Sequence, residues 1–151
     1  MNLVRNLDNR PIIISETGEL ASWLTQMQLS DIFGTTLYRT VYNQITGYFS
    51  YPVVPGYYSL RSNFFRKYFA QNNQKTIIVE LQAEPWIPSN SPIGTTVESQ
   101  LKIFPLDKMK ENIDFAEKTS FDEIYLWGVE WWYFMKRKGH PEYWDYAKTL
   151  I

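Results

Sequence analysis

Apolar residues along the chain fall into four short runs, and stretches with helical spacing lie between these runs. Short apolar runs bounded by polar residues or glycine are typical of buried parallel strands. The predicted strands cover residues 11–15, 35–42, 76–82 and 123–128. The predicted helices begin near Leu20, Leu60, Leu106 and Pro141. This alternation predicts an α/β fold in which about four parallel strand-helix units form one sheet covered by helices.

The same pattern predicts which side chains share a face. In the second strand, Leu37 and Val41 alternate with Thr36, Tyr38, Thr40 and Tyr42. In the third, Ile77, Val79 and Leu81 alternate with Ile78, Glu80 and Gln82. The helix after the second strand carries an apolar stripe of Leu60, Phe64 and Tyr68. Residues 43–56 are predicted to be a loop, and 83–104 a long connection rich in Pro and Ser, of a length that is commonly functional or disordered.

Residues 1–8 look like the last two turns of a helix that leads into the first strand. The chain is therefore expected to begin in the middle of a fold. We expect residues 1–151 to form one partial domain that lacks an N-terminal half.

Composition excludes several classes of function. The 15 Lys and Arg residues nearly balance the 16 Asp and Glu residues, and this net charge of −1 gives no basic field for nucleic acid. Aromatic residues make up 17% of the chain, with six Trp, eleven Tyr and nine Phe. Such rings form cores, and they also form platforms for the apolar face of a sugar.

Carboxylates are the reactive groups that the composition leaves. The chain has no Cys, so it has neither thiolate chemistry nor disulfides, and the single His140 cannot form a histidine metal cluster. We expect no metal and no cofactor. No signal peptide is evident in residues 1–11, and no run approaches the ~20 apolar residues of a membrane span. Location is left open, since a missing N-terminal half could have carried a secretion signal.

Polar and aromatic residues gather where the predicted strands end. Ligand sites of parallel α/β folds lie at the carboxyl ends of the strands. The candidates there are Glu16, Glu19, Tyr38, Tyr42, Glu80, Gln82, Glu84, Trp86 and Trp127. Glu80 is the sharpest of them, because a carboxylate that closes a buried strand is costly unless it is paired or functional.

Each candidate also has a structural alternative. Glu80 could form an ion pair at the edge of the sheet, and Glu84 a salt bridge in a loop. Glu16 and Glu19 could cap the following helix, since acidic residues favour a helix N-terminus. Trp127 could belong to the core. His140 is expected only to mark a helix boundary.

Two motifs resemble those of a known family. Thr76-Ile-Ile-Val-Glu80-Leu, followed by a long connection and helix and then Tyr125-Leu-Trp127-Gly128, resembles strands 7 and 8 of clan A-type retaining glycoside hydrolases, which include cellulases, xylanases, mannanases and β-galactosidases. These enzymes are (β/α)8 barrels. The resemblance covers essentially the whole chain but only strands 5 to 8 of the barrel.

The resemblance implies an activity and a set of roles. Glu80 would be the nucleophile and Trp127 the platform under the sugar, with Tyr38 near the nucleophile and the segment Ser15–Glu19 in a binding loop. The expected substrate is a β-linked carbohydrate. The Asn-Glu-Pro motif that carries the family's acid/base is absent, and Ala83-Glu84-Pro85 follows the wrong strand to replace it.

Two other functions stay open at this point. One is a non-catalytic carbohydrate-binding α/β protein. The other is a small α/β domain with Tyr38 and Trp127 in its core and no ligand site. Half a barrel also has two open sheet edges, which could associate with another chain.

Overall fold

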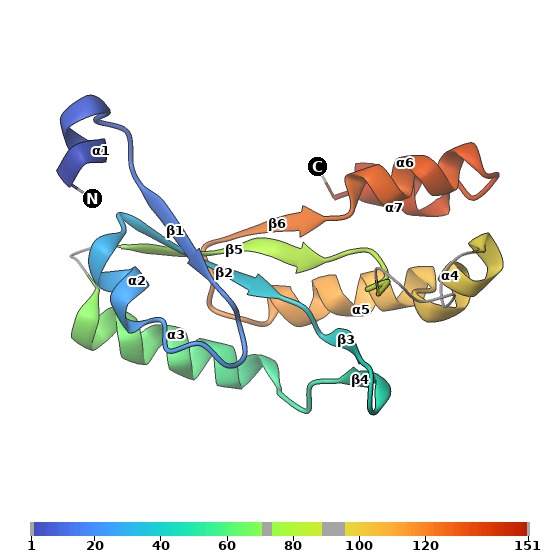
Figure 1. Ribbon diagram of the computed structural model, residues 1–151, viewed down its shortest axis with the longest axis horizontal. Coiled ribbons are helices and arrows are strands. Elements are labelled where there is room, and N and C mark those ends of the chain that lie inside the picture. Colours follow the sequence, from blue (N-terminus) through green and yellow to red (C-terminus); the bar gives the residue numbers. More distant parts are fainter. Residues whose placement is uncertain (1, 71–73, 89–95, 151) are drawn as a thin grey trace.

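The structure, a computed structural model, describes residues 2–70, 74–88 and 96–150. It confirms an α/β protein with a parallel sheet (Figure 1). The strands are β1 (Ile13–Glu16), β2 (Ile32–Leu37), β3 (Thr40–Asn43), β4 (Gly47–Ser50), β5 (Lys75–Gln82) and β6 (Glu123–Trp127). The helices are α1 (Asn2–Leu7), α2 (Leu24–Leu29), α3 (Pro55–Phe69), α4 (Val97–Ile103), α5 (Leu106–Glu117), α6 (Val129–Arg137) and α7 (Glu142–Lys148).

The main sheet has four strands in the order β1-β2-β5-β6, and each neighbouring pair is parallel. Strands that follow one another within this sheet therefore also lie next to one another. The segment between β2 and β5 contains a separate antiparallel hairpin of β3 and β4 as well as α3. In Figure 1 this hairpin projects beyond the end of β2, on the side toward which the parallel strands point.

One face of the sheet forms the hydrophobic core. Phe33, Leu37, Ile78 and Leu81 are fully buried in a cluster with residues of the surrounding helices. The helix residues of this cluster include Met27 of α2, Tyr58 of α3, and Met109 and Ala116 of α5. Figure 1 shows α3 and α5 running along the same side of the strands. Because side chains alternate along a strand, Thr36 and Tyr38 lie on the opposite face from Leu37.

A β-bulge in β5 decides where Glu80 points. Thr35 pairs with Ile78 but Thr36 pairs with Glu80, so Val79 is an extra residue in β5. Strict alternation would have placed Glu80 on the core face with Ile78, whereas the bulge moves it to the face of Thr36 and re-aims its side chain. Gly34 makes room for this bulge, since a Cβ added to it would lie 2.7 Å from Cγ1 of Val79.

The predicted second strand is wrong in its boundaries. β2 begins at Ile32, passes through Gly34, and ends at Leu37, where residues 35–42 had been expected to form one strand. Residues 40–50, which span the end of the predicted strand and the start of the predicted loop at 43–56, form the β3–β4 hairpin. The face assignment in β5 is also wrong, because Ile78 and Leu81 share the core face on either side of the bulge.

Two helix predictions also need correction. The stripe of Leu60, Phe64 and Tyr68 on α3 faces solvent, with 74%, 50% and 59% of these residues exposed. The core face of α3 carries Tyr58 and Ser62 instead. The connection at 83–104 contains α4, which begins at a capping box formed by Thr96 and Ser99. By contrast, α5 begins at Leu106 as predicted, and Met109, Ile113 and Ala116, which share one face at helical spacing, are buried.

Candidate functional site

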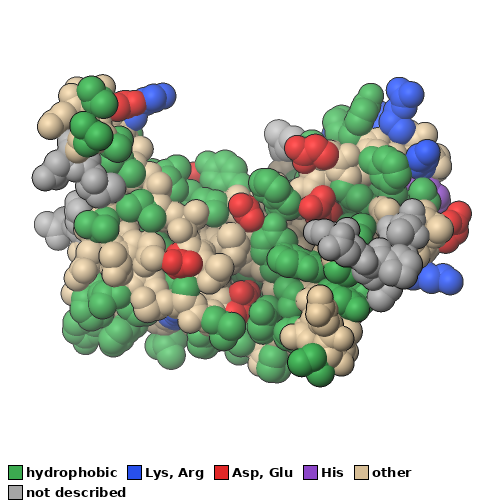
Figure 2. Space-filling view, viewed as in Figure 1, with side chains coloured by type: hydrophobic (Ala, Val, Ile, Leu, Met, Phe, Trp, Pro, Cys, Tyr) green, Lys and Arg blue, Asp and Glu red, His purple; other side chains and the backbone are tan. Residues whose placement is uncertain are grey.

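A cavity of about 410 Å³ lies at the carboxyl ends of β1, β2 and β5, a volume within the range of small-molecule sites. Its walls come from the β1–α2 loop, β2, the β3–β4 hairpin and β5. The residues that line it are Thr17, Glu19, Leu20, Thr36, Tyr38, Val41, Tyr51, Glu80 and Trp86. Figure 2 shows this face of the molecule hollowed near its middle, with acidic side chains around the hollow and Lys and Arg mostly at the ends.

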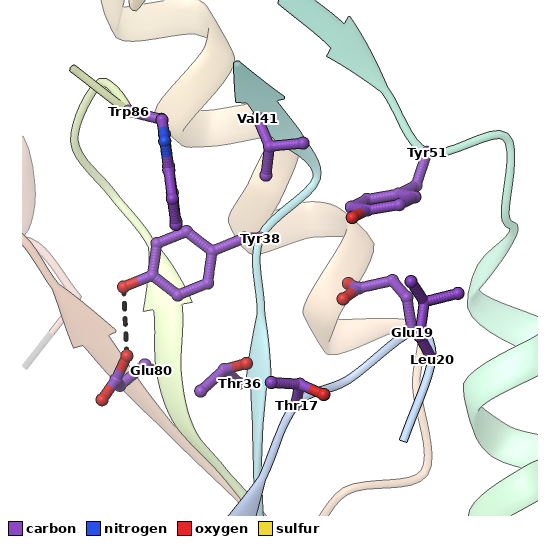
Figure 3. Close-up of a pocket in the computed structure, with 9 residues that line it drawn as sticks. All are labelled: Thr17, Glu19, Leu20, Thr36, Tyr38, Val41, Tyr51, Glu80 and Trp86. Atoms are coloured by element: carbon purple, nitrogen blue, oxygen red, sulfur yellow. Dashed lines mark hydrogen bonds between the residues drawn. The ribbon is translucent and has the colours of Figure 1, made fainter. Parts of the chain in front are cut away.

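Glu80, Tyr38 and Trp86 form one side of the cavity (Figure 3). The hydroxyl of Tyr38 donates a hydrogen bond to Oε2 of Glu80 over 3.1 Å. The ring of Trp86 meets that of Tyr38 edge-on, with 5.4 Å between the centroids. Burial raises the pKa of Tyr38, and the charge of Glu80 raises it further. Tyr38 therefore stays protonated at neutral pH and can keep donating to a Glu80 carboxylate.

Glu19 lies on the other side of the cavity, and Figure 3 shows its carboxyl below the ring of Tyr51. The hydroxyl of Tyr58 donates to Oε1 of Glu19 over 2.8 Å. Burial raises the pKa of Glu19, although this bond and the charge of Arg61 act in the opposite direction. The cavity thus contains two carboxyl groups, and each of them receives a tyrosine hydroxyl.

Trp127 and Glu84 form a pair at the neighbouring strand ends, outside the lining of this cavity. The indole Nε1 of Trp127 donates to Oε1 of Glu84 over 3.1 Å. Burial raises the pKa of Glu84; the bond from Trp127 opposes this rise, and the nearby charge of Glu130 adds to it. Trp127 is 47% exposed, so the alternative that placed it in the core is wrong.

Two further candidates, Gln82 and Tyr42, are not among the residues that line the cavity. Gln82 is buried, and its amide donates to the carbonyl of Thr40 and accepts from the backbone N–H of the same residue. Tyr42 packs edge-on against Tyr48 inside the hairpin. Gln82 therefore holds the start of the hairpin against β5, and Tyr42 packs β3 against β4 within the hairpin.

Glu16 accepts hydrogen bonds from the side chain of Gln26 and from the backbone N–H of Thr17. Helix capping by Glu16 or Glu19 is not observed, because α2 begins at Leu24 and its first turn contains no acidic residue. Glu16 therefore ties the β1–α2 loop to the side of α2, while Glu19 is left to face the cavity.

The cavity also contains residues that the sequence did not single out. They are Leu20 of the β1–α2 loop, Thr36 of β2, Val41 of β3, and Tyr51 directly after β4, whereas Thr17 belongs to the segment 15–19 that was expected in a binding loop. The available signal for Tyr51 was an aromatic residue followed by Pro52 in a stretch with two glycines and one further proline. That signal was not specific enough, because the hairpin that carries Val41 and precedes Tyr51 was itself not predicted.

Residues 2–70, 74–88 and 96–150 contain neither a candidate metal site nor a candidate membrane-spanning helix. In that part of the chain, no group of three or more His, Asp or Glu side chains is arranged to hold a metal ion. None of the helices described there combines the length and the apolar character that crossing a membrane requires.

Comparison with known proteins gives no match to a family model, a curated protein or a solved structure. The function of this chain is therefore inferred from its own geometry.

Proposed function

We propose that this chain is the nucleophile-bearing part of a retaining glycoside hydrolase that acts on β-linked sugars, and that its four strands form half of a (β/α)8 barrel. Glu80 is the proposed nucleophile. The observation that carries the proposal is its position: a bulge directs Glu80 into a cavity at the strand ends, where Tyr38 holds the carboxylate beside an aromatic wall.

The sheet supports the barrel part of the proposal. In a (β/α)8 barrel, strands that follow one another are neighbours, helices cover the outer face, and the active site lies at the carboxyl ends. The order β1-β2-β5-β6, the core shared with α2, α3 and α5, and the position of the cavity all agree with that arrangement. β1 and β6 would be the strands that border the other half.

In the proposed mechanism an oxygen of Glu80 attacks the anomeric carbon. A C–O bond forms to the enzyme, the glycosidic C–O bond breaks, and the leaving oxygen takes a proton from a second carboxyl group. Water then attacks the same carbon, gives its proton to that second group, and releases Glu80 as a carboxylate. Tyr38 stabilises the charged form of Glu80 before attack and after release.

The second carboxyl group of a retaining enzyme lies roughly 5 to 5.5 Å from the nucleophile. Its motif is absent from this sequence, so in the proposal it comes from the other half of the barrel. A natural glycoside needs this acid because an unprotonated sugar oxygen is a poor leaving group, whereas a good aryl leaving group departs with little protonation.

A non-catalytic carbohydrate-binding protein is the second candidate. The observation in its favour is that hydrogen bonds within the chain fix both carboxyls of the cavity and also the exposed Trp127 against Glu84, as in a binding site. A third alternative, with all rings in the core and no ligand site, disagrees with the cavity and with the exposure of Trp127.

The test is hydrolysis of a panel of aryl β-glycosides by the purified chain, alone and mixed with a fragment that supplies strands 1 to 4 of a related barrel. We expect turnover in the mixture and its loss with Glu80→Gln. Sugar binding without turnover in either setting, unaffected by Glu80→Gln, would support the binding protein and refute the nucleophile.

A further inference from the structure

We propose that Glu19 and Tyr51 form a second sugar subsite beside the one at Glu80, so that the ligand of the cavity is an oligosaccharide with at least two rings. This inference rests on the proposed carbohydrate function and adds the length of the substrate. It assigns a ligand-binding role to a loop and a hairpin that the reaction itself does not use.

The cavity has two ends with similar chemistry. Figure 3 shows Glu80, Tyr38 and Trp86 on one side, Glu19, Leu20 and Tyr51 on the other, and Thr36 and Thr17 between them. Each end therefore combines one carboxyl with at least one aromatic ring. A pyranose ring needs this combination, because its C–H face packs on an aromatic ring and its hydroxyls donate to a carboxylate.

The loop that carries Glu19 is held at three successive carbonyl groups. The indole of Trp23 donates to the carbonyl of Thr17 over 2.9 Å. Arg61 donates to the carbonyl of Gly18 over 2.7 Å, and the hydroxyl of Tyr57 donates to that of Glu19 over 3.2 Å. A side chain on such a fixed loop loses little conformational entropy when it binds a ligand.

Close packing against β2 also fixes the loop that carries Glu19. A Cβ added to Gly18 would lie 2.3 Å from the carbonyl oxygen of Thr36, so only glycine allows this approach. The carboxyl of Glu19 is then held by Tyr58, a fully buried residue. These contacts hold the carboxyl of Glu19 at the border of the cavity, where it can accept hydrogen bonds from a ligand.

Tyr51 supplies the ring of the subsite. It follows β4, and its backbone N–H donates to the carbonyl of Arg39 over 3.0 Å, which fixes it at the base of the hairpin. Glu19 lies close enough for its charge to raise the pKa of Tyr51, an effect second to that of burial. Carboxyl and ring therefore border the same end of the cavity.

The test compares sugars of one and two rings by isothermal titration. The probes are glucose with cellobiose, mannose with mannobiose, and xylose with xylobiose. At least one disaccharide should bind the wild-type chain about tenfold more tightly than its monosaccharide. Glu19→Gln and Tyr51→Ala should each remove most of that advantage and leave the monosaccharide affinity unchanged. For Glu19→Gln, the loss of one charge-assisted hydrogen bond should weaken disaccharide binding about tenfold. Glu117→Gln, on the exposed side of α5, is the matched control.

The outcomes separate the subsite from the proposed function. The subsite would be overturned if each disaccharide bound no more tightly than its monosaccharide, or if Glu19→Gln kept the full disaccharide affinity. Covalent labelling of Glu80 could still be demonstrated in either case. The absence of both sugar binding and covalent labelling of Glu80 by activated glycosides would overturn the carbohydrate function, and the subsite with it.

Discussion

Replacing Gly18 by Ala should both destabilise the fold and displace Glu19. The added methyl group would lie 2.3 Å from the carbonyl oxygen of Thr36, where ordinary contacts begin at 3.4 Å, so the loop must move by about 1 Å. β2 cannot yield, because it is paired on both sides within the sheet. The movement would stretch the 2.7 Å hydrogen bond from Arg61 to the carbonyl of Gly18.

Overpacking of this kind costs about 1–3 kcal/mol, and each kcal/mol lowers Tm by about 2–4 °C in a chain of this length. Thermal and urea unfolding of Gly18→Ala would measure the loss. Gly56→Ala is the matched control: it lies in α3, a Cβ there meets nothing within 4 Å, and it should stabilise the protein by up to about 1 kcal/mol. A Gly18→Ala protein as stable as the wild type would refute the packing argument for this loop.

The remaining predictions concern charge, buried polar groups and the surface. Because burial raises the pKa of Glu19, its carboxyl binds a proton more tightly in the folded protein than in the unfolded chain. The free energy of unfolding should therefore fall as pH rises above the pKa of an ordinary glutamate. Urea unfolding from about pH 4 to pH 7 should show a smaller fall in Glu19→Gln than in the wild type. Gln82→Ala should cost about 2–4 kcal/mol in the same assay, since it leaves two buried backbone groups unpaired, and a cost below about 1 kcal/mol would contradict that reasoning. Phe64→Lys, on the exposed stripe of α3, should change the free energy of unfolding by less than about 0.5 kcal/mol. Leu81→Ala, in the core, should lower it by about 2–5 kcal/mol. The opposite order would show that the stripe of α3 is buried in solution.

The sequence predicted the parts of the fold that follow a single period. β5, β6 and α5 lie close to where apolar runs and helical spacing put them, because each is long enough for its pattern to be read. The second strand was expected to begin at residue 35, directly after Gly34, but Gly34 lies inside β2, where its missing side chain makes room for Val79. Only the neighbouring strand shows why glycine is needed there, so the boundary of β2 could not be predicted locally.

The candidate site was predicted in part for the same reason. Residues at strand ends were expected to converge, and Glu80, Tyr38, Trp86 and Glu19 do line one cavity. The bulge that directs Glu80 into the cavity has no clear local signal, since Val79 fits a regular strand equally well.

Tertiary contacts decide the roles of the other candidates. Gln82 and Glu16 bond to nearby parts of the fold, and their partners become visible only when the hairpin and α2 are in place. The hairpin itself was missed because Thr40 to Tyr42 continues the alternation of β2 in the sequence although the chain leaves the sheet after Leu37.

Covalent labelling is the sharpest test of Glu80 as the nucleophile. Dinitrophenyl glycosides in which fluorine replaces the hydroxyl next to the anomeric carbon carry a leaving group that needs no acid, and they form a slowly hydrolysed glycosyl-enzyme. We expect incubation to add one fluorosugar mass to the chain, peptide mapping to place it on Glu80, and Glu80→Gln to abolish it. Labelling at Glu19 or Glu84 with Glu80 unmodified, or no labelling although the intact sugar binds, would contradict the assignment of Glu80 as the nucleophile.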